Sequence, residues 1–223
     1  SGIVDNNKFI RNLINDVKFI SKFDVEKIKT SKDGFNIIVD KFGNRLKAKT
    51  VIWANGFEMT NLSQNVPITP TSGQVTYLKA NELSSNLKIN FSYGHHFSQA
   101  FKGYHQIGAS FNRNANTSYR EIDQKNNIKS IPEFLRKNIL YNVNESSHRV
   151  SVRASTKDRM PFFGNFKSFI DKKSENTYVL GGMGAWGFVY APLYAELLVK
   201  KILNEQIVIN KNIEKLLTVE RFL

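Results

Sequence analysis

The segment from Thr177 to Ile202 is the sequence feature that most constrains the fold of this chain. It begins with a short apolar run, Tyr178 to Leu180, which predicts a buried strand, and a cluster of glycines then interrupts the pattern. Four apolar residues recur after the glycines on one face of a predicted helix: Leu193, Leu197, Leu198 and Ile202. A strand, a glycine turn and a helix bring backbone N–H groups and a helix N-terminus against a ligand, and both attract negative charge.

Gly182, Gly184 and Gly187 form a GxGxxG pattern, which is typical of a dinucleotide-binding loop. A loop of that kind opens a βαβ unit and is followed about 20 residues later by an acidic residue that binds ribose. Glu205 falls near that distance, but Trp186 lies inside the pattern and too few residues follow for the remaining strands. We therefore interpret this stretch as something other than the phosphate loop.

Composition limits the chemistry open to the chain. Because it contains no cysteine, disulfides, zinc–thiolate sites, iron–sulfur clusters and cysteine nucleophiles are excluded, and a cytoplasmic location is the default expectation. No apolar run approaches the roughly 18 residues that a membrane span needs, so no membrane partner is expected. The histidines lack both a GxSxG elbow and the i, i+4 spacing of a helical metal pair: His95, His96, His105 and His148. Neither a catalytic triad nor a metal site is predicted.

The net charge of +13 comes from 32 Lys and Arg against 19 Asp and Glu. An excess of this size predicts attraction to a polyanion such as a nucleic acid. The basic residues are spread along the chain, however, and a scattered excess is more often a solvated surface than a nucleic-acid groove. Charge alone leaves both interpretations open.

Periodicity and turn residues predict an α/β chain with mixed sheets. Predicted helices cover 5–15, 118–129, 132–140, the stretch after Gly187 and one short segment beyond 210. Predicted strands cover 17–20, 24–30, 34–39, 45–48, 50–54, 73–78, 89–93, 96–101, 105–110, 149–154 and 178–180. A turn is predicted at 161–165 and a polar loop at 171–176.

Arg153 lies within the mostly apolar strand predicted at 149–154. An arginine in such a strand needs an anionic or polar partner, because burying it unpaired is very costly. It is therefore one half of a structural ion pair or a clamp for a ligand carboxylate, and the residues themselves favour neither.

Three blocks resemble the D-amino-acid oxidase/glycine oxidase superfamily of flavoproteins: Val51–Gly56, Arg153–Gly164 and Gly182–Glu196. Within it, the chain is similar to the FAD-dependent oxidoreductase half of the bifunctional enzymes of tRNA 5-methylaminomethyl-2-thiouridine biosynthesis. Shorter matches support this: Ser72–Val75, Ile107–Arg113 and Ala191–Leu198. The resemblance implies a partial FAD/NAD(P)-binding domain, 1–66 with a C-terminal return at 155–223, and a mixed-sheet substrate-binding domain at 67–154.

The resemblance also implies roles for individual residues. Arg153 matches the arginine that binds the substrate carboxylate. Weaker candidates for the substrate pocket are Tyr104, His105 and Trp186, and the alternative for each is core packing or a place on the strand surface. The FAD-binding positions match Val25, Ala54, Gly56, Gly182, Met183, Gly184, Ala185 and Gly187.

The resemblance implies FAD-dependent removal of the carboxymethyl group, as glyoxylate, from 5-carboxymethylaminomethyluridine at the wobble position of tRNA. The family's N-terminal βαβ unit and any methyltransferase domain, which would use S-adenosylmethionine, are expected in a segment that this chain lacks. Two alternatives remain: a flavin oxidase of small amines or amino acids like glycine oxidase, and a non-catalytic RNA-binding module.

Overall fold

The computed structural model describes residues 4–138, 146–166, 169 and 176–222, and they form two compact units. The first unit comprises the segment that ends at Phe19 together with Ser72–Val152. The second comprises Ile20–Thr71 and Arg153–Leu223. Each unit has its own sheet and its own hydrophobic core.

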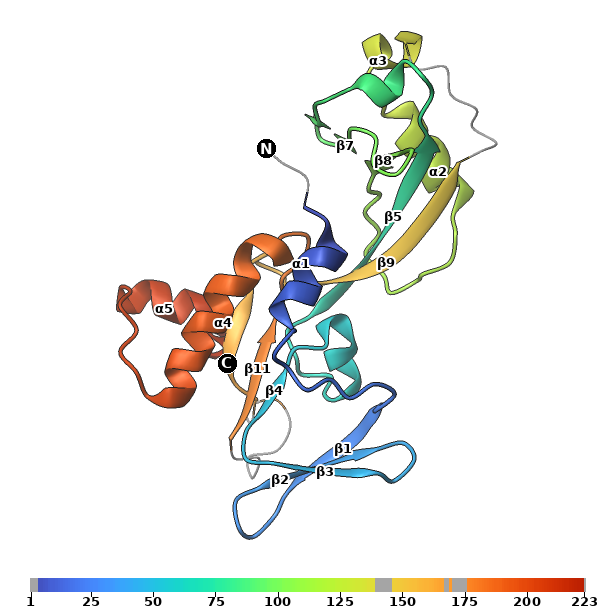
Figure 1. The fold of residues 1–223 in the computed structure, drawn as a ribbon. Coiled ribbons are helices and arrows are strands. Elements are labelled where there is room, and N and C mark those ends of the chain that lie inside the picture. The colour runs from blue at the N-terminus through green and yellow to red at the C-terminus, as the bar shows by residue number, and fades with distance from the viewer. Residues whose placement is uncertain (1–3, 139–145, 167–168, 170–175, 223) are drawn as a thin grey trace. The chain divides into compact units, whose positions relative to one another are not determined.

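The first unit is built on a five-stranded sheet in the order β6-β7-β8-β5-β9 (Figure 1). Its strands are β5 (Thr69–Lys79), β6 (Phe91–Ser92), β7 (His96–Phe97), β8 (Tyr104–Gly108) and β9 (Ser147–Ser155). The helical elements of this unit are α1 (Asn6–Leu13), η2 (Ser84–Asn86), α2 (Glu121–Lys129) and α3 (Glu133–Asn138).

The two faces of this sheet differ in character. Leu78, Phe97 and Ile107 pack on one face against apolar residues of α2 and α3 and of the turn that joins them. On the same face, Thr76 donates a 2.8 Å hydrogen bond to Gln124 of α2. The pairing of Tyr77 with Gln106 and of Lys79 with Tyr104 places these residues on the opposite face, because side chains alternate along a strand.

The second unit is built on a mixed sheet in the order β10-β11-β4. β11 (Thr177–Gly181) pairs antiparallel with β10 (Phe162–Asn165) and parallel with β4 (Val51–Trp53). α4 (Gly187–Leu203) and α5 (Lys211–Leu217) pack on the face that carries Phe163, and α4 lies against β10 and β11 (Figure 1). η1 (Gly56–Asn61) and η5 (Val219–Phe222) pack on the face that carries Phe162 and Val179.

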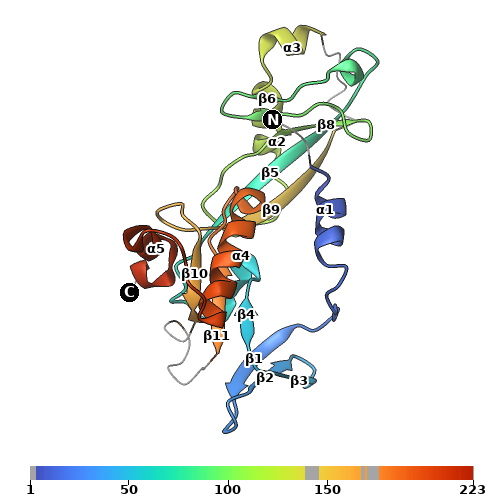
Figure 2. The ribbon, with the colours of Figure 1, turned by 60° about the vertical axis from the view of Figure 1, so that its left-hand side comes forward.

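A separate antiparallel meander precedes β4 (Figure 2). Its strands are β1 (Val25–Thr30), β2 (Asn36–Asp40) and β3 (Arg45–Ala48). Asp40 closes the second turn by accepting hydrogen bonds from the backbone nitrogens of Phe42 and Asn44 and from the Asn44 side chain. The Asn44 side-chain bond is the main cause that lowers the pKa of the Asp40 carboxyl.

The mixed α/β fold class is confirmed, and most predicted elements are present with shifted ends. Two predictions are wrong. The predicted turn at 161–165 is strand β10, since Phe162 and Phe163 bury on opposite faces of the sheet. The predicted strand at 17–20 is not formed, and Val17, Phe19 and Ile20 are exposed. The predicted loop at 171–176 and the end of the helix at 132–140 fall mostly outside the described residues.

No helix within the described residues is long and apolar enough to cross a membrane. In that same part of the chain, no three His, Asp or Glu side chains are grouped so that they could bind a metal ion.

Candidate functional site

The glycine loop between β11 and α4 is tied to the end of β9. Gly182 and Gly184 have φ angles of +73° and +54°, which reverse the chain direction after the strand. The Gly184 nitrogen donates a 2.8 Å hydrogen bond to the carbonyl oxygen of Ala154, and the Trp186 nitrogen donates one of 3.0 Å to Met183. The loop is therefore held next to the residue that follows Arg153.

The two positive-φ glycines have different surroundings. A Cβ atom on Gly182 would lie 2.7 Å from Thr156 Cγ2 and 3.0 Å from Phe162 Cδ1, so packing within the unit requires glycine there. A Cβ atom on Gly184 would meet only Ser155 Oγ, at 3.6 Å. The backbone at Gly184 is thus open to the approach of another group.

The N-terminus of α4 begins directly after this loop and has no side-chain cap. Its N-cap residue is Trp186, and its first turn contains no acidic residue. The first N–H groups of a helix lack intrahelical partners and carry a partial positive charge. Because α4 has 17 residues, its N-terminus is suited to an electron-rich or anionic group from outside the helix.

Arg153 is half-buried, and its Nη1 atom is buried without a hydrogen-bond partner among the described residues. No carboxylate in that part of the chain forms an ion pair with it. Burial lowers the pKa of the guanidinium from its usual value, which is the expected effect of desolvation without a compensating charge. An unpaired buried N–H costs free energy, so this arrangement favours a ligand that completes the pairing.

Asp158, by contrast, is used inside the fold. Arg221 of η5 donates two hydrogen bonds to its carboxylate, of 2.7 and 3.3 Å, and a third of 2.7 Å to the Met160 carbonyl. Burial alone would raise the pKa of Asp158, but hydrogen bonds from Arg221, Met160 and Thr156 lower it to about 2. The hydrogen bonds of Arg221 therefore connect the segment after β9 to η5 at the C-terminal end of the second unit.

The remaining predicted FAD-binding positions lie in the same unit as the loop. Val25 opens β1 and packs against the same hydrophobic cluster as Ala154. Ala54 follows β4 and is exposed, while Gly56 begins η1 with a φ angle of +66°. A Cβ atom on Gly56 would meet nothing within 4 Å, so its backbone is also open to a ligand.

The three weaker pocket residues have unequal environments. Trp186 is 60% exposed, and Tyr104 is exposed on the polar face of the first unit's sheet. His105 is fully buried on the other face, where it stacks on Phe97, and its ring nitrogens contact the Ser98 carbonyl and the Ser84 hydroxyl. These contacts are those of a structural residue in the core. The role of His105 in a substrate pocket stays a prediction.

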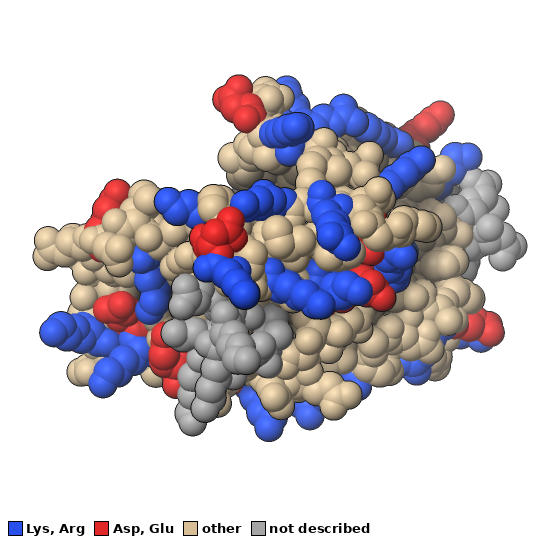
Figure 3. All heavy atoms as spheres, turned by 90° about the horizontal axis from the view of Figure 1, so that it is seen from below, with Lys and Arg blue, Asp and Glu red and all other residues tan. Residues whose placement is uncertain are grey.

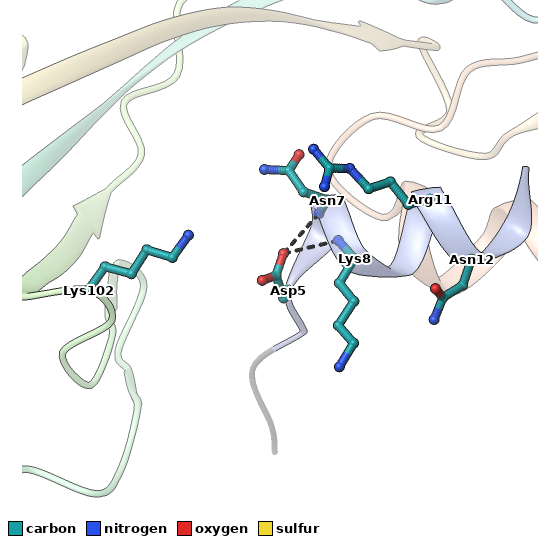
Figure 4. A pocket seen from close by; sticks show the side chains of 6 residues that line it. All are labelled: Asp5, Asn7, Lys8, Arg11, Asn12 and Lys102. Atoms are coloured by element: carbon teal, nitrogen blue, oxygen red, sulfur yellow. Dashed lines mark hydrogen bonds between the residues drawn. The ribbon is translucent and has the colours of Figure 1, made fainter. Parts of the chain in front are cut away.

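A polar pocket of about 350 Å³ in the first unit was not predicted from the sequence (Figure 4). Asp5, Asn7, Lys8, Arg11 and Asn12 of the α1 region line it together with Lys102. Lys8 and Arg11 are three residues apart on a helix, which the sequence indicates, but the proximity of Lys102 depends on the tertiary fold.

Comparison with known proteins shows the family to which the chain belongs. A family model described as FAD dependent oxidoreductase matches residues 1–201. The chain is 30% identical over 199 residues to the tRNA 5-methylaminomethyl-2-thiouridine biosynthesis bifunctional protein of Idiomarina loihiensis. This match covers 87% of the chain and 32% of the relative. The protein of the same name from Aliivibrio fischeri is 26% identical over 193 residues, with 74% of this chain and 28% of the relative covered.

Solved structures share the fold at low sequence identity. Iminodiacetate oxidase from a Chelativorans species superposes with a TM-score of 0.71 at 16% identity, covering 92% of this chain and 55% of that one. Glycine oxidase from Bacillus cereus superposes with a TM-score of 0.64 at 15% identity, covering 82% and 49%. The chain thus spans less than a third of the length of the two bifunctional relatives and about half of these oxidases.

Proposed function

The chain belongs to the family of FAD-dependent oxidoreductases, and on that premise we propose that it forms the substrate-carboxylate site of a tRNA-modifying enzyme. The proposed substrate is the carboxymethylaminomethyl side chain of a wobble uridine. The expected products are glyoxylate and the 5-aminomethyl nucleoside.

The Arg153 guanidinium has an unsatisfied N–H group. Its buried Nη1 atom has no partner within the described chain, and it lies one residue before the carbonyl that binds the glycine loop. A carboxylate would satisfy the guanidinium with charge-assisted hydrogen bonds, which are roughly twice as strong as neutral ones. The carboxymethyl group of the proposed substrate supplies such a carboxylate.

The residues around the loop fit FAD. The open backbone at Gly56 and Gly184 and the uncapped N-terminus of α4 are features that an electron-rich ring system would use. Val25, Ala54, Gly56 and the stretch Gly182–Gly187 would hold the group. The chemistry that FAD supplies when bound is acceptance of hydride from the carbon next to the amine nitrogen.

The protein's own contribution is orientation and electrostatics. Arg153 would fix the carboxylate, and the position of the neighbouring methylene carbon follows from that contact. Trp186 at the N-terminus of α4 is an exposed aromatic residue of the same unit as Arg153, and its proposed role is to exclude water from the substrate. Methyl transfer from S-adenosylmethionine would belong to a different domain of the longer protein.

We propose that a further segment of the longer protein, which carries the dinucleotide-binding loop, packs against the second unit. β4 is an edge strand of its sheet within the described residues, and Ile52 on it is 43% exposed. The outer face of α4 also exposes Phe188, Val189 and Leu193. An apolar edge of this kind needs covering, and the relatives are more than three times as long as the part that this chain matches.

A longer protein that contains this chain provides the test. The protein is purified, its flavin content is measured, and it is incubated with tRNA that carries carboxymethylaminomethyluridine. Mass spectrometry of the nucleosides and an assay for glyoxylate follow the reaction. Flavin together with the aminomethyl nucleoside supports the proposal.

Two other outcomes identify the alternatives. Oxidation of glycine or iminodiacetate without reaction on tRNA would assign the small-amine oxidase function. A protein that binds tRNA but cannot be loaded with flavin would assign the non-catalytic RNA-binding function. Either result rejects the proposal.

A further inference from the structure

We propose that the pocket between α1 and the turn at Lys102 binds phosphate groups of an RNA backbone. The inference deepens the proposed function, because it rests on tRNA as the partner and assigns a place where tRNA is held. All residues that line this pocket belong to the first unit, whereas the glycine loop and Arg153 belong to the second.

The lining of this pocket is mainly cationic. Three cationic side chains, Lys8, Arg11 and Lys102, line it together with one carboxylate, Asp5. Among the residues that the structure describes, none of these three cations is paired with a carboxylate. Some lysines elsewhere are paired: Lys41 binds Asp24 and Lys47 binds Asp33, at 2.7 and 2.8 Å.

Asp5 is already used by the fold. Its Oδ1 atom accepts hydrogen bonds from the backbone nitrogens of Asn7 and Lys8, at 3.1 and 3.2 Å, and so caps α1 (Figure 4). The carboxylate therefore compensates the N-terminal end of the helix. Its negative charge still offsets one of the three cations, so the lining keeps a net charge of +2 that attracts an anion.

Lys102 is held at the tip of a tight turn. Phe101 and Tyr104 exchange backbone hydrogen bonds of 2.8 and 3.1 Å, and Lys102 and Gly103 have φ angles of +51° and +82°. Two central residues with positive φ angles are typical of a type I′ turn, which favours Asn, Asp or Gly at the lysine position. The two hydrogen bonds of the turn thus fix the backbone of Lys102. Figure 4 shows the Lys102 side chain directed toward the first turn of α1.

The surroundings favour RNA over a small free anion. Phe101 and Tyr104 flank Lys102 and are 49% and 42% exposed, and the Lys102 ammonium lies 5.4 Å from the centre of the Phe101 ring. Bases of an unpaired RNA segment stack on exposed aromatic rings, while lysine and arginine bind the phosphates. The sequence from Leu83 to Arg120 contains no Asp or Glu, so no acidic side chain of this segment opposes a polyanion.

The overall charge does not explain this pocket. On the face drawn in Figure 3, Lys and Arg side chains are spread among other residues and not gathered in one groove. A scattered excess of that kind attracts any polyanion weakly. The pocket differs because it gathers three cations, the amides of Asn7 and Asn12, and neighbouring aromatic rings.

The test compares two triple variants of the longer, flavin-loaded protein. The first replaces the pocket cations: Lys8→Gln, Arg11→Gln and Lys102→Gln. The control removes the same charge from exposed lysines of the second unit: Lys29→Gln, Lys49→Gln and Lys211→Gln. The Kd for tRNA is measured for each protein at several salt concentrations, together with kcat and KM.

We expect the pocket variant to bind tRNA at least tenfold more weakly. Its slope of log affinity against log salt should be smaller by about two, because each phosphate contact adds roughly 0.7 to 0.9 to that slope. The control should weaken binding by less than about threefold. The KM for tRNA should rise, while kcat and flavin content stay unchanged.

Equal weakening of binding in both variants would overturn the inference, since general electrostatics would then account for it. If the pocket variant binds and turns over tRNA normally, the inference fails and the proposed function stands. If the unaltered protein neither binds nor oxidises tRNA, both fail.

Discussion

The amide nitrogen of Gly184 donates a 2.8 Å hydrogen bond to the carbonyl oxygen of Ala154. This bond joins the loop before α4 to the strand that carries Arg153, although the two segments are far apart in the sequence. The bond therefore links the loop, whose backbone is open at Gly184, to the residue next to Arg153, whose Nη1 atom is unpaired. Residues on either side of this contact give the clearest tests of the structure.

Gly182→Ala should destabilise the protein by about 2 to 4 kcal/mol. The new Cβ atom would lie 2.7 Å from Thr156 Cγ2, and alanine is disfavoured at a φ angle of +73°. Gly187→Ala is the matched control, because its φ angle is not positive and the nearest atom would be 3.7 Å away. Urea denaturation measures both variants, and equal stability would contradict the packing described for Gly182.

Gly184→Ala should separate folding from cofactor binding. Alanine at a φ angle of +54° costs roughly 1 to 2 kcal/mol, and no close contact adds to this. If FAD approaches this backbone, the variant of the longer protein should lose flavin at concentrations at which Gly34→Ala retains it, since Gly34 in the meander has a φ angle of +78° and an open Cβ position. Equal flavin content and equal affinity in the two variants would remove Gly184 from the predicted cofactor site.

Asp158→Asn should reduce stability at neutral pH, by about 1 kcal/mol after allowance for the partly exposed carboxylate. The folded pKa of Asp158 is about 2 against an ordinary value of 3.8. Its contribution is therefore complete above about pH 4 and is lost as the pH falls toward 2. The unfolding free energy of the wild type and of the variant should converge over that range.

Asp33→Asn is a control for the same pH range. A hydrogen bond from Lys47, followed by one from Ser31, lowers the pKa of Asp33 to about 2, but this pair is exposed in the meander. Its effect at neutral pH should be smaller than that of Asp158→Asn, because Arg221 is only 9% exposed. A larger effect for Asp33→Asn would contradict the role assigned to the Asp158–Arg221 pair.

His105 should make the protein less stable in mild acid. Burial lowers its folded pKa below 6.5, so the unfolded chain takes up the proton first as the pH falls through that value. His105→Gln should lower stability at pH 8 and flatten the dependence between about pH 7 and 5. A histidine NMR titration that gives an ordinary pKa for this ring would contradict its burial between Ser84 and Ser98.

Local patterns predicted much of this fold, and their failures have physical causes. The patterns of apolar and polar residues, together with turn residues, predicted the meander and β11, because local sequence determines these elements. The turn prediction at 161–165 failed because Pro161 and Gly164 flank two phenylalanines that bury on opposite faces. Gly164 has a φ angle of +151°, and its Cβ position would lie 2.7 Å from Val219, a contact that no local pattern reveals.

The site residues also differ in whether the sequence could predict them. Arg153 was singled out by its apolar surroundings in the sequence. Its Nη1 atom is buried without a partner among the described residues, and its role toward a substrate stays a prediction. The FAD-binding positions came from family resemblance and stay predictions. The pocket that includes Lys102 could not be predicted, since it depends on how the Phe101–Tyr104 turn lies relative to α1.

The most direct test of the account is the rate of flavin reduction by modified tRNA in the longer protein, measured for Arg153→Gln. Arg149→Gln, an exposed arginine on the same strand, is the control. With equal flavin content, we predict that Arg153→Gln lowers the rate at least 100-fold while Arg149→Gln lowers it less than about threefold. Equal rates of flavin reduction in Arg153→Gln and wild type would show that Arg153 does not hold the substrate carboxylate.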